Sequence, residues 1–212
     1  MQRDVILIFG QTGCGKTYLA RQIARSRNRV LVADAGFQDF APIPSAPDYD
    51  TLLSSLNQSK AFNGGAFRIA YDFRREEYPL IFATALELRG STLVIDEADR
   101  LDISDYYYQE ALYRGRHYGL SLVFVALQPT SIPTDVRRQA TCIVAFRQLL
   151  PADVDWLSQI VGETAFQLPS ISGPPNPPPH SCLFWTQAQG AQIVPPGGLD
   201  RLLPANPACS II

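Results

Sequence analysis

The sequence is poor in the residues that build metal clusters, disulfide frameworks and membrane spans. Its 212 residues include four cysteines, two histidines and one methionine, and no two cysteines have C-x-x-C spacing. This pattern indicates neither a zinc site nor a disulfide scaffold. No apolar stretch approaches the ~20 residues that cross a bilayer. Because charged residues near the start lead directly into an apolar run, we expect no signal peptide and a cytosolic protein.

An excess of charge of either sign is also missing. Eighteen basic residues, only two of them lysines, stand against twenty acidic ones, which gives a net charge of −2. The chain as a whole therefore has no field that would draw it onto nucleic acid, and any DNA contact must be local. A hydrophobic content of 46% and a charged content of 18% are typical of a globular protein with one large domain.

What the sequence does contain is a phosphate-binding loop. Residues 10–17, Gly-Gln-Thr-Gly-Cys-Gly-Lys-Thr, fill every fixed position of the G-x-x-x-x-G-K-[ST] pattern and follow the apolar run 5–9. In such a loop, backbone N–H groups face the β-phosphate, the lysine reaches the β and γ oxygens, and the last hydroxyl holds Mg²⁺. We therefore expect ATP to bind at Gly10, Gln11, Thr12, Gly13, Cys14, Gly15, Lys16 and Thr17.

Two adjacent carboxylates follow a second apolar run. Asp96 and Glu97 come directly after residues 92–95, which read as a central strand. Asp96 at the strand end is suited to hold Mg²⁺ opposite Thr17, and Glu97 to orient and deprotonate the attacking water. This pair favours hydrolysis over phosphate transfer to a small substrate. The alternative is that these residues, with Asp99 and Asp102, form only a solvated acidic loop.

Further candidates lie beyond the carboxylates. Gln128 follows the next apolar run, where an amide would sense the γ-phosphate or the lytic water; the alternative is a polar cap that meets only solvent. Hydrolysis of this kind usually needs an arginine on the γ-phosphoryl oxygens, and none neighbours the loop in sequence. An arginine from an adjacent subunit would serve, although each candidate is equally consistent with an ordinary exposed residue. These candidates are Arg114, Arg116, Arg137 and Arg138.

Strand and helix patterns alternate along the chain, which predicts an α/β fold with a mainly parallel sheet. The predicted strands are 5–9, 29–33, 67–71, 92–95, 120–126 and 141–146, with a C-terminal hairpin of 182–186 and 191–194. The predicted helices are 16–26, 49–56, 75–88, 104–118, 133–139 and 152–161, and 37–50 reads as a loop. We assign 1–195 to one domain containing a proline-rich loop at 169–180, and 196–212 to a weakly ordered tail.

The ordered set of motifs resembles one family. Residues 116–129, an arginine followed by a glycine, an apolar strand and Gln128-Pro129, precede a further strand and complete the two motifs above. Over about residues 4–165 the chain is similar to the FtsK/HerA superfamily of DNA-pumping ATPases. Its compact size is similar to the genome-packaging ATPases of tailless, membrane-containing viruses. The Pro129-Thr-Ser segment differs from relatives, which often carry a basic residue there.

The resemblance implies a RecA-like P-loop NTPase that hydrolyses ATP with Mg²⁺. It implies Lys16 and Thr17 on the phosphates and Mg²⁺, Glu97 as catalytic carboxylate, Gln128 as sensor and Arg116 as the finger acting on a neighbouring copy. It further implies a homo-oligomeric ring, commonly a hexamer, around double-stranded DNA. A packaging enzyme would act in the host cytoplasm or at a virion packaging vertex, with capsid vertex proteins or the viral inner membrane as partners. The alternatives are a cellular or plasmid motor for repair or conjugation, and an assembly switch with little turnover.

Overall fold

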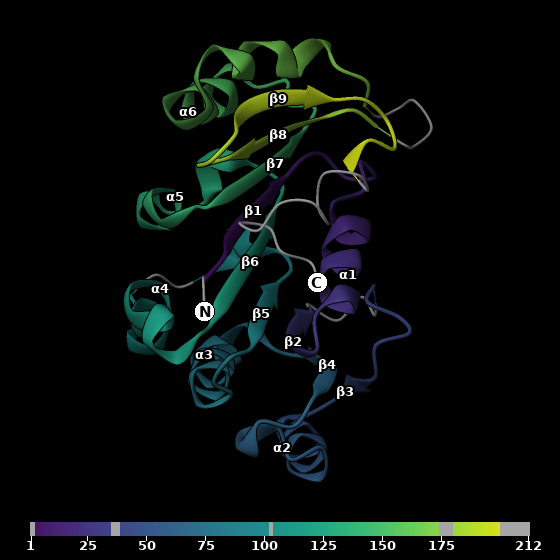
Figure 1. The fold of residues 1–212 in the computed structure, drawn as a ribbon, viewed down its shortest axis with the longest axis vertical. Coiled ribbons are helices and arrows are strands. Elements are labelled where there is room, and N and C mark those ends of the chain that lie inside the picture. The colour runs from purple at the N-terminus through teal and green to yellow at the C-terminus, as the bar shows by residue number, and fades with distance from the viewer. Residues whose placement is uncertain (1–2, 35–38, 102–103, 174–179, 200–212) are drawn as a thin grey trace.

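A computed structural model of the protein describes residues 3–34, 39–101, 104–173 and 180–199. Its described part folds into a single nine-stranded sheet with helices on both faces (Figure 1). The strands are β1 (Val5–Phe9), β2 (Arg29–Asp34), β3 (Ser45–Ala46), β4 (Phe67–Asp72), β5 (Thr92–Ile95), β6 (Ser121–Ala126), β7 (Cys142–Phe146), β8 (Cys182–Thr186) and β9 (Gly190–Val194). The α-helices are α1 (Lys16–Ser26), α2 (Tyr49–Gln58), α3 (Tyr78–Glu87), α4 (Tyr106–Tyr118), α5 (Thr134–Gln139) and α6 (Pro151–Val161).

The strand order is β3-β4-β2-β5-β6-β1-β7-β8-β9. Every pair from β3 across to β7 is parallel, whereas β8 runs antiparallel to β7 and β9 antiparallel to β8. The predicted α/β class with a mainly parallel sheet and a C-terminal hairpin is therefore confirmed. Because β1 lies between β6 and β7, the loop that follows it opens in the middle of the sheet.

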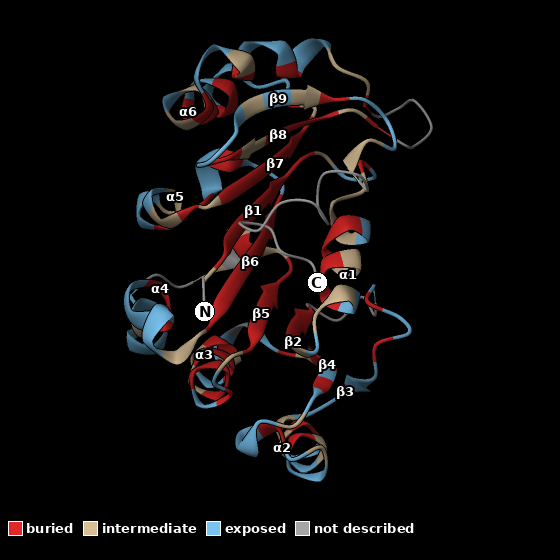
Figure 2. Cartoon of the chain, in the orientation of Figure 1, coloured by how far each residue is buried: buried red, intermediate tan, exposed pale blue. Residues whose placement is uncertain are grey.

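The apolar runs form strands that are buried on both faces (Figure 2). Every residue of β1, β5, β6 and β7 is buried. Alternate side chains of β1 enter two different cores: Ile6 and Ile8 pack in the cluster under α1, and Leu7 and Phe9 in the cluster that includes α3, α4 and α6. Each buried side chain of this size contributes about 1.5–3 kcal/mol. Two-sided burial fixes the strand register and gathers the loops after the parallel strands at one edge.

The predicted loop at 37–50 is wrong in one part, because it contains β3. Ser45 and Ala46 pair in parallel with Ala70 and Tyr71 at the edge of the sheet. Prolines on either side of this two-residue strand are tolerated, since an outermost strand needs to donate to only one neighbour. Residues 35–38 of the predicted loop lie outside the described part of the chain.

Two helix predictions also need correction. The helix predicted from Arg75 begins at Tyr78, and residues 75–77 form a separate 3₁₀ turn. Pro79 has no N–H and suits the first turn of a helix, so the α-helix begins beside it. Gly162–Ser170, for which we predicted no helix, is a 3₁₀ helix that includes Pro169. The start of the predicted proline-rich loop is thus helical, and residues 174–179 are not described.

The C-terminal hairpin is confirmed, with β8 at the predicted residues and β9 beginning at Gly190. The expectation of weak order over 196–212 falls largely outside the described residues, since 200–212 are not described. A domain boundary at 195 therefore stays a prediction. No helix in the part of the chain that the structure describes is long and apolar enough to span a membrane.

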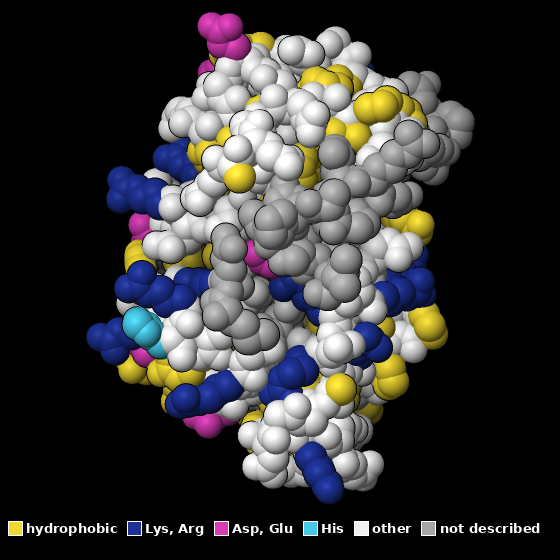
Figure 3. Space-filling view, viewed as in Figure 1, with side chains coloured by type: hydrophobic (Ala, Val, Ile, Leu, Met, Phe, Trp, Pro, Cys, Tyr) yellow, Lys and Arg dark blue, Asp and Glu magenta, His cyan; other side chains and the backbone are white. Residues whose placement is uncertain are grey.

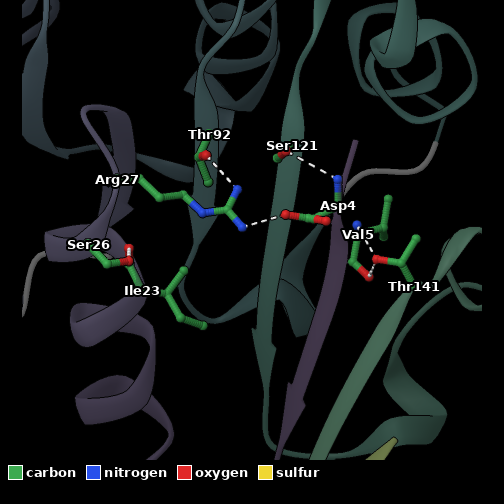
Figure 4. Close-up of polar contacts among 8 residues, drawn as sticks. All are labelled: Asp4, Val5, Ile23, Ser26, Arg27, Thr92, Ser121 and Thr141. Carbon is green, nitrogen blue, oxygen red and sulfur yellow. Dashed lines mark hydrogen bonds and ion pairs between the residues drawn. The ribbon is translucent and has the colours of Figure 1, made fainter. Parts of the chain in front are cut away.

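Several buried polar side chains form hydrogen bonds at the edge where the parallel strands begin (Figure 4). Arg27 donates to Asp4 Oδ2 at 2.6 Å and to Thr92 Oγ1 at 3.0 Å. The hydroxyl of Ser121 accepts from the backbone N–H of residue 4, and that of Thr141 from the N–H of residue 5. Burial raises the pKa of Asp4, and Arg27 counteracts that rise. These bonds connect the start of β1 to the end of α1 and to three other strands.

Candidate ATP-hydrolysis site

The phosphate-binding loop connects the end of β1 to the start of α1. Gly10 has φ +155°, and a Cβ added there would lie 2.5 Å from Cys14 Sγ and 2.7 Å from Phe146 Cβ. Gly15, with φ +101°, is the residue that caps α1. Both positions therefore require glycine. No side chain fits at Gly10, and the positive φ at both residues is unfavourable for a residue with a Cβ. The loop can turn its N–H groups toward a bound phosphate, next to the positive end of α1.

The structure brings together the polar side chains of the two motifs. Lys16 Nζ donates to the carbonyl of Gln11 at 3.0 Å, which holds the ammonium group over the loop. Thr17 Oγ1 lies 3.4 Å from Asp96 Oδ2, although 79 residues separate them in the chain. Hydroxyl and carboxylate oxygens are the hard donors that Mg²⁺ prefers, so this pair fits a magnesium ion shared with phosphate oxygens.

The electrostatic environment of Asp96 supports that fit. Burial raises the pKa of Asp96 to about 6, and the negative charges of Asp34 and Asp39 add to the rise. Lys16 and the backbone N–H of Glu97 act in the opposite direction. Burial and the charges of Asp34 and Asp39 disfavour the ionised form of Asp96. A divalent cation beside Asp96 would offset that negative charge and would therefore be attracted there.

Glu97 adopts a backbone conformation that non-glycine residues rarely adopt. Its φ is +53° and ψ +45°, and its N–H donates to Asp96 Oδ1 at 3.1 Å. A left-handed conformation costs roughly 1–2 kcal/mol for a residue with a Cβ. Such cost is typical of positions where function requires a defined side-chain direction. The turn brings the Glu97 carboxylate into the same cleft as the phosphate-binding loop.

The two motifs and the predicted sensor line one cleft of about 550 Å³. Gln128 is exposed at the end of β6, so it lies at the mouth of this cleft. The cleft is lined by Thr12, Gly13, Lys16, Thr17, Asp39, Asp96, Glu97, Asp99, Val125, Ala126, Leu127, Gln128 and Ser131. A bound triphosphate, a cation, the Glu97 carboxylate and the Gln128 amide can therefore meet in this cleft.

Asp99 connects the catalytic loops, and sequence reasoning treated it only as part of an acidic stretch. Its Oδ2 accepts from the N–H of Leu127 at 3.2 Å, and its Oδ1 from the hydroxyl of Ser131. Asp99 lies two residues after Glu97, and Leu127 directly precedes Gln128. The Asp99 carboxylate thus holds the loop of Glu97 against the loop of Gln128. Finding it requires the neighbouring positions of β5 and β6, which only the folded sheet supplies.

The candidate arginines lie far from the cleft of their own chain. Arg116 is exposed near the end of α4, just before β6 begins, whereas Gln128 follows the end of that strand. β6, whose six residues at ~3.3 Å each span about 20 Å, therefore runs between the two positions. Arg138 is likewise exposed just before β7, whereas Arg137 donates to Gln159 at 2.9 Å and lies 5.0 Å from the ring of Trp156.

Arg114 pairs weakly with Glu110 at 3.7 Å along the same helix. Basic side chains lie on the side of the molecule that carries α4 and α5 and also across the rest of the lower half of this face (Figure 3). Burial, and then the nearby charge of Arg116, lower the pKa of Arg3 to about 10. None of the four candidate arginines lines the cleft in the described part of the chain, and their action on a nucleotide bound to another copy stays a prediction.

A family model described as an AAA domain matches residues 1–129, a segment that begins before β1 and includes the loop, both carboxylates and Gln128. The chain belongs to the AAA domain family. It is a P-loop ATPase. A search of curated proteins found no match to the sequence.

Several solved structures share the fold. The genome packaging NTPase B204 from Sulfolobus turreted icosahedral virus 2, in complex with ATP-gammaS, is 19% identical with a TM-score of 0.71, over 92% of this chain and 99% of that one. The conjugation coupling protein TcpA of pCW3 is 12% identical, with a TM-score of 0.57, over 93% and 61%. The type VII secretion ATPase EccC from Thermomonospora curvata is 12% identical, with a TM-score of 0.56, over 90% and 23%. The resemblance inferred from the motifs is confirmed at the level of the fold.

Proposed function

We propose that this ATPase translocates double-stranded DNA and packages a viral genome into a preformed capsid. The observation that carries the proposal is a complete hydrolytic cleft at one edge of the sheet with the candidate finger at the opposite edge. The fold likeness to B204 over nearly the whole of both chains supports the packaging role. The enzyme would then work in the host cytoplasm, against a capsid vertex.

The position of Arg116 supports assembly into a ring, which we take to be a hexamer. Arg116 is exposed on α4 and does not line the cleft of its own chain, so a nucleotide bound to a neighbouring copy is the one it would reach. Arginines supplied in this way accelerate phosphoryl transfer by 10³–10⁵. Among the four candidates, Arg114, Arg116 and Arg138 are exposed, whereas Arg137 is held by Gln159 and Trp156.

In the proposed reaction, Lys16 orients the β and γ oxygens, and Thr17 and Asp96 hold magnesium. The cation, when bound, neutralises charge on the transferring phosphoryl group. Glu97 accepts the proton of the attacking water, and Gln128 contacts the γ-phosphate. Loss of that contact after hydrolysis would move the loop after β6, which Asp99 connects to the loop after β5.

The test is the ATPase rate of the full chain with and without linear double-stranded DNA, together with particle mass in nucleotide. We expect stimulation by DNA and a ring mass. Arg116→Ala should bind ATP normally but lose at least 10³-fold in ring activity. Mixing it with Lys16→Ala subunits should partly restore the rate, because each variant supplies what the other lacks. Arg25→Ala, which removes an exposed arginine that is not a finger candidate, is the control and should retain activity.

A conjugation motor is the second candidate, favoured by the fold likeness to TcpA. Both motors predict stimulation by DNA, so the partner separates them: a packaging enzyme binds procapsids, and a coupling protein does not. An assembly switch predicts neither stimulation nor turnover. A monomer that hydrolyses ATP at full rate at any dilution would contradict both motors.

A further inference from the structure

The cleft accounts for only one end of the nucleotide. Glu97 and Gln128 follow β5 and β6, which lie on one side of β1. If the γ-phosphate faces these residues, the base lies at the opposite end of the ligand, toward β7 on the other side of β1. Phe146 ends β7 and contacts the loop, since it would lie 2.7 Å from a Cβ on Gly10. The chain just beyond Phe146 is therefore where a base would arrive.

Two buried polar side chains lie at that place. Gln148 is 3% exposed and His180 is 6% exposed. Within the described residues, Gln148 Nε2 and both ring nitrogens of His180 have no hydrogen-bond partner. Buried donors and acceptors in native proteins are almost always satisfied, so such groups call for a water or a ligand. The sequence did not identify either residue as a candidate, because low exposure and missing hydrogen-bond partners can be recognised only in the folded chain.

Both residues lie just beyond the end of the β7–β8 ladder. Phe146 pairs with Cys182 in the antiparallel β7–β8 ladder, and Gln148 and His180 each lie two residues beyond that pair. Continuing the register sets them opposite one another. Phe146 and Cys182 pack in the core cluster under α1, which also contains Cys14 of the phosphate-binding loop.

The backbone that carries His180 is held in place. Ser172 Oγ accepts from the N–H of Ser181 at 2.9 Å and donates to its hydroxyl at 3.1 Å. Gly173 packs against the chain beside Gln148, where a Cβ would lie 2.8 Å from Arg147 Cβ. The unpartnered nitrogens therefore sit on a fixed frame next to the loop.

We infer that Gln148 and His180 form the subsite that recognises the purine base of the nucleotide. A glutamine amide can donate to a ring nitrogen of adenine and accept from its 6-amino group at the same time. Imidazole supplies one donor and one acceptor, which match the remaining edge of a purine. The inference rests on the proposed hydrolytic function for the direction of the triphosphate.

The experiment compares ATP with inorganic tripolyphosphate, which lacks a base, by calorimetric titration of the full-length protein with Mg²⁺. The variants are Gln148→Leu and His180→Phe, which keep most of the side-chain volume. Ser91→Ala is the control, because Ser91 is a buried hydroxyl without a partner among the described residues that precedes β5 at the opposite edge. Thermal unfolding without ligand establishes that each variant folds.

We expect each subsite variant to weaken ATP binding at least tenfold and to leave tripolyphosphate binding within twofold of wild type. Ser91→Ala should change neither. Unchanged ATP affinity in both variants would overturn the inference and leave the pair as ordinary hydrated core residues. An equal loss for both ligands would also overturn it, because the loop itself would then be disturbed. DNA-stimulated hydrolysis is measured separately, so a failure here is distinguishable from a failure of the proposed motor.

Discussion

The two edges of the parallel sheet use buried polar groups in opposite ways. Where the strands begin, Asp4 is paired with Arg27, and the surrounding hydroxyls accept from backbone N–H groups. Where the strands end, Asp96 is crowded by other carboxylates, and Glu97 has a left-handed backbone. One edge therefore stabilises the fold, and the other carries conformational and electrostatic cost that a bound nucleotide can relieve. Substitutions at each edge should separate stability from chemistry.

The largest expected effect is at the edge where the parallel strands end. Glu97→Gln keeps the shape of the side chain but removes the base, so the hydrolysis rate should fall by about 10²–10⁴. ATP affinity, measured by titration, should stay within twofold. Glu163→Gln, an exposed carboxylate outside the cleft, is the control and should hydrolyse normally. An undiminished rate in Glu97→Gln would assign the base to another residue.

At the edge where the parallel strands begin, a substitution should lower stability and leave nucleotide binding unchanged. Arg27→Met leaves Asp4 buried without its partner, so the free energy of unfolding should fall by roughly 3 kcal/mol. ATP affinity of the folded fraction should not change. Arg25→Met removes a more exposed arginine of the same helix and should cost less than 1 kcal/mol. Adding Asp4→Asn to Arg27→Met should recover most of the loss in denaturant titrations, and no recovery would mean that packing matters more than charge.

A third substitution tests whether the loops of Glu97 and Gln128 depend on each other for their alignment. Asp99→Asn weakens the contacts to Leu127 and Ser131, so the loops of Glu97 and Gln128 are less well aligned. Misalignment of this size costs about 10- to 100-fold in kcat, and the affinity for ATP should be retained. Ser131→Ala, which removes only one of the two contacts, should give a smaller loss in steady-state assays. Equal losses in kcat and affinity would indicate general damage to the cleft.

The smallest effect measures the backbone cost directly. Glu97→Gly removes the Cβ at a φ of +53°, so the free energy of unfolding should rise by about 1 kcal/mol while hydrolysis is lost. Lys60→Gly is the matched control, because Lys60 has φ +54° on the surface away from the cleft. It should give a similar gain in stability with unchanged hydrolysis. A destabilised Glu97→Gly would mean that the side chain contributes more packing than the backbone costs.

The sequence was informative wherever one local signal decides the structure. β1 and β5 are continuous apolar runs, and α1 begins in a glycine-rich motif, so their bounds were predicted to the residue. The same signals placed Lys16, Thr17 and Asp96, which the fold brings together.

Features that depend on contacts between distant segments could not be predicted. β3 has only two residues, and its strand character comes from pairing with β4 rather than from its own proline-flanked sequence. The role of Asp99 depends on the adjacency of two loops, and the interest of Gln148 and His180 depends on burial. Arg137 was an open candidate beside Arg116, and its contacts with Gln159 and Trp156 appear only in the fold.

The central position of β1 also affects how the protein is made. β1 pairs with β6 and β7, whose residues lie more than 110 positions later in the chain. Such distant pairing slows folding and keeps early apolar segments exposed while synthesis continues. A ribosome-bound chain that has emerged only through β5 carries the whole glycine-rich motif without either neighbouring strand. We therefore expect the nascent chain to bind nucleotide only after Phe146 has left the exit tunnel.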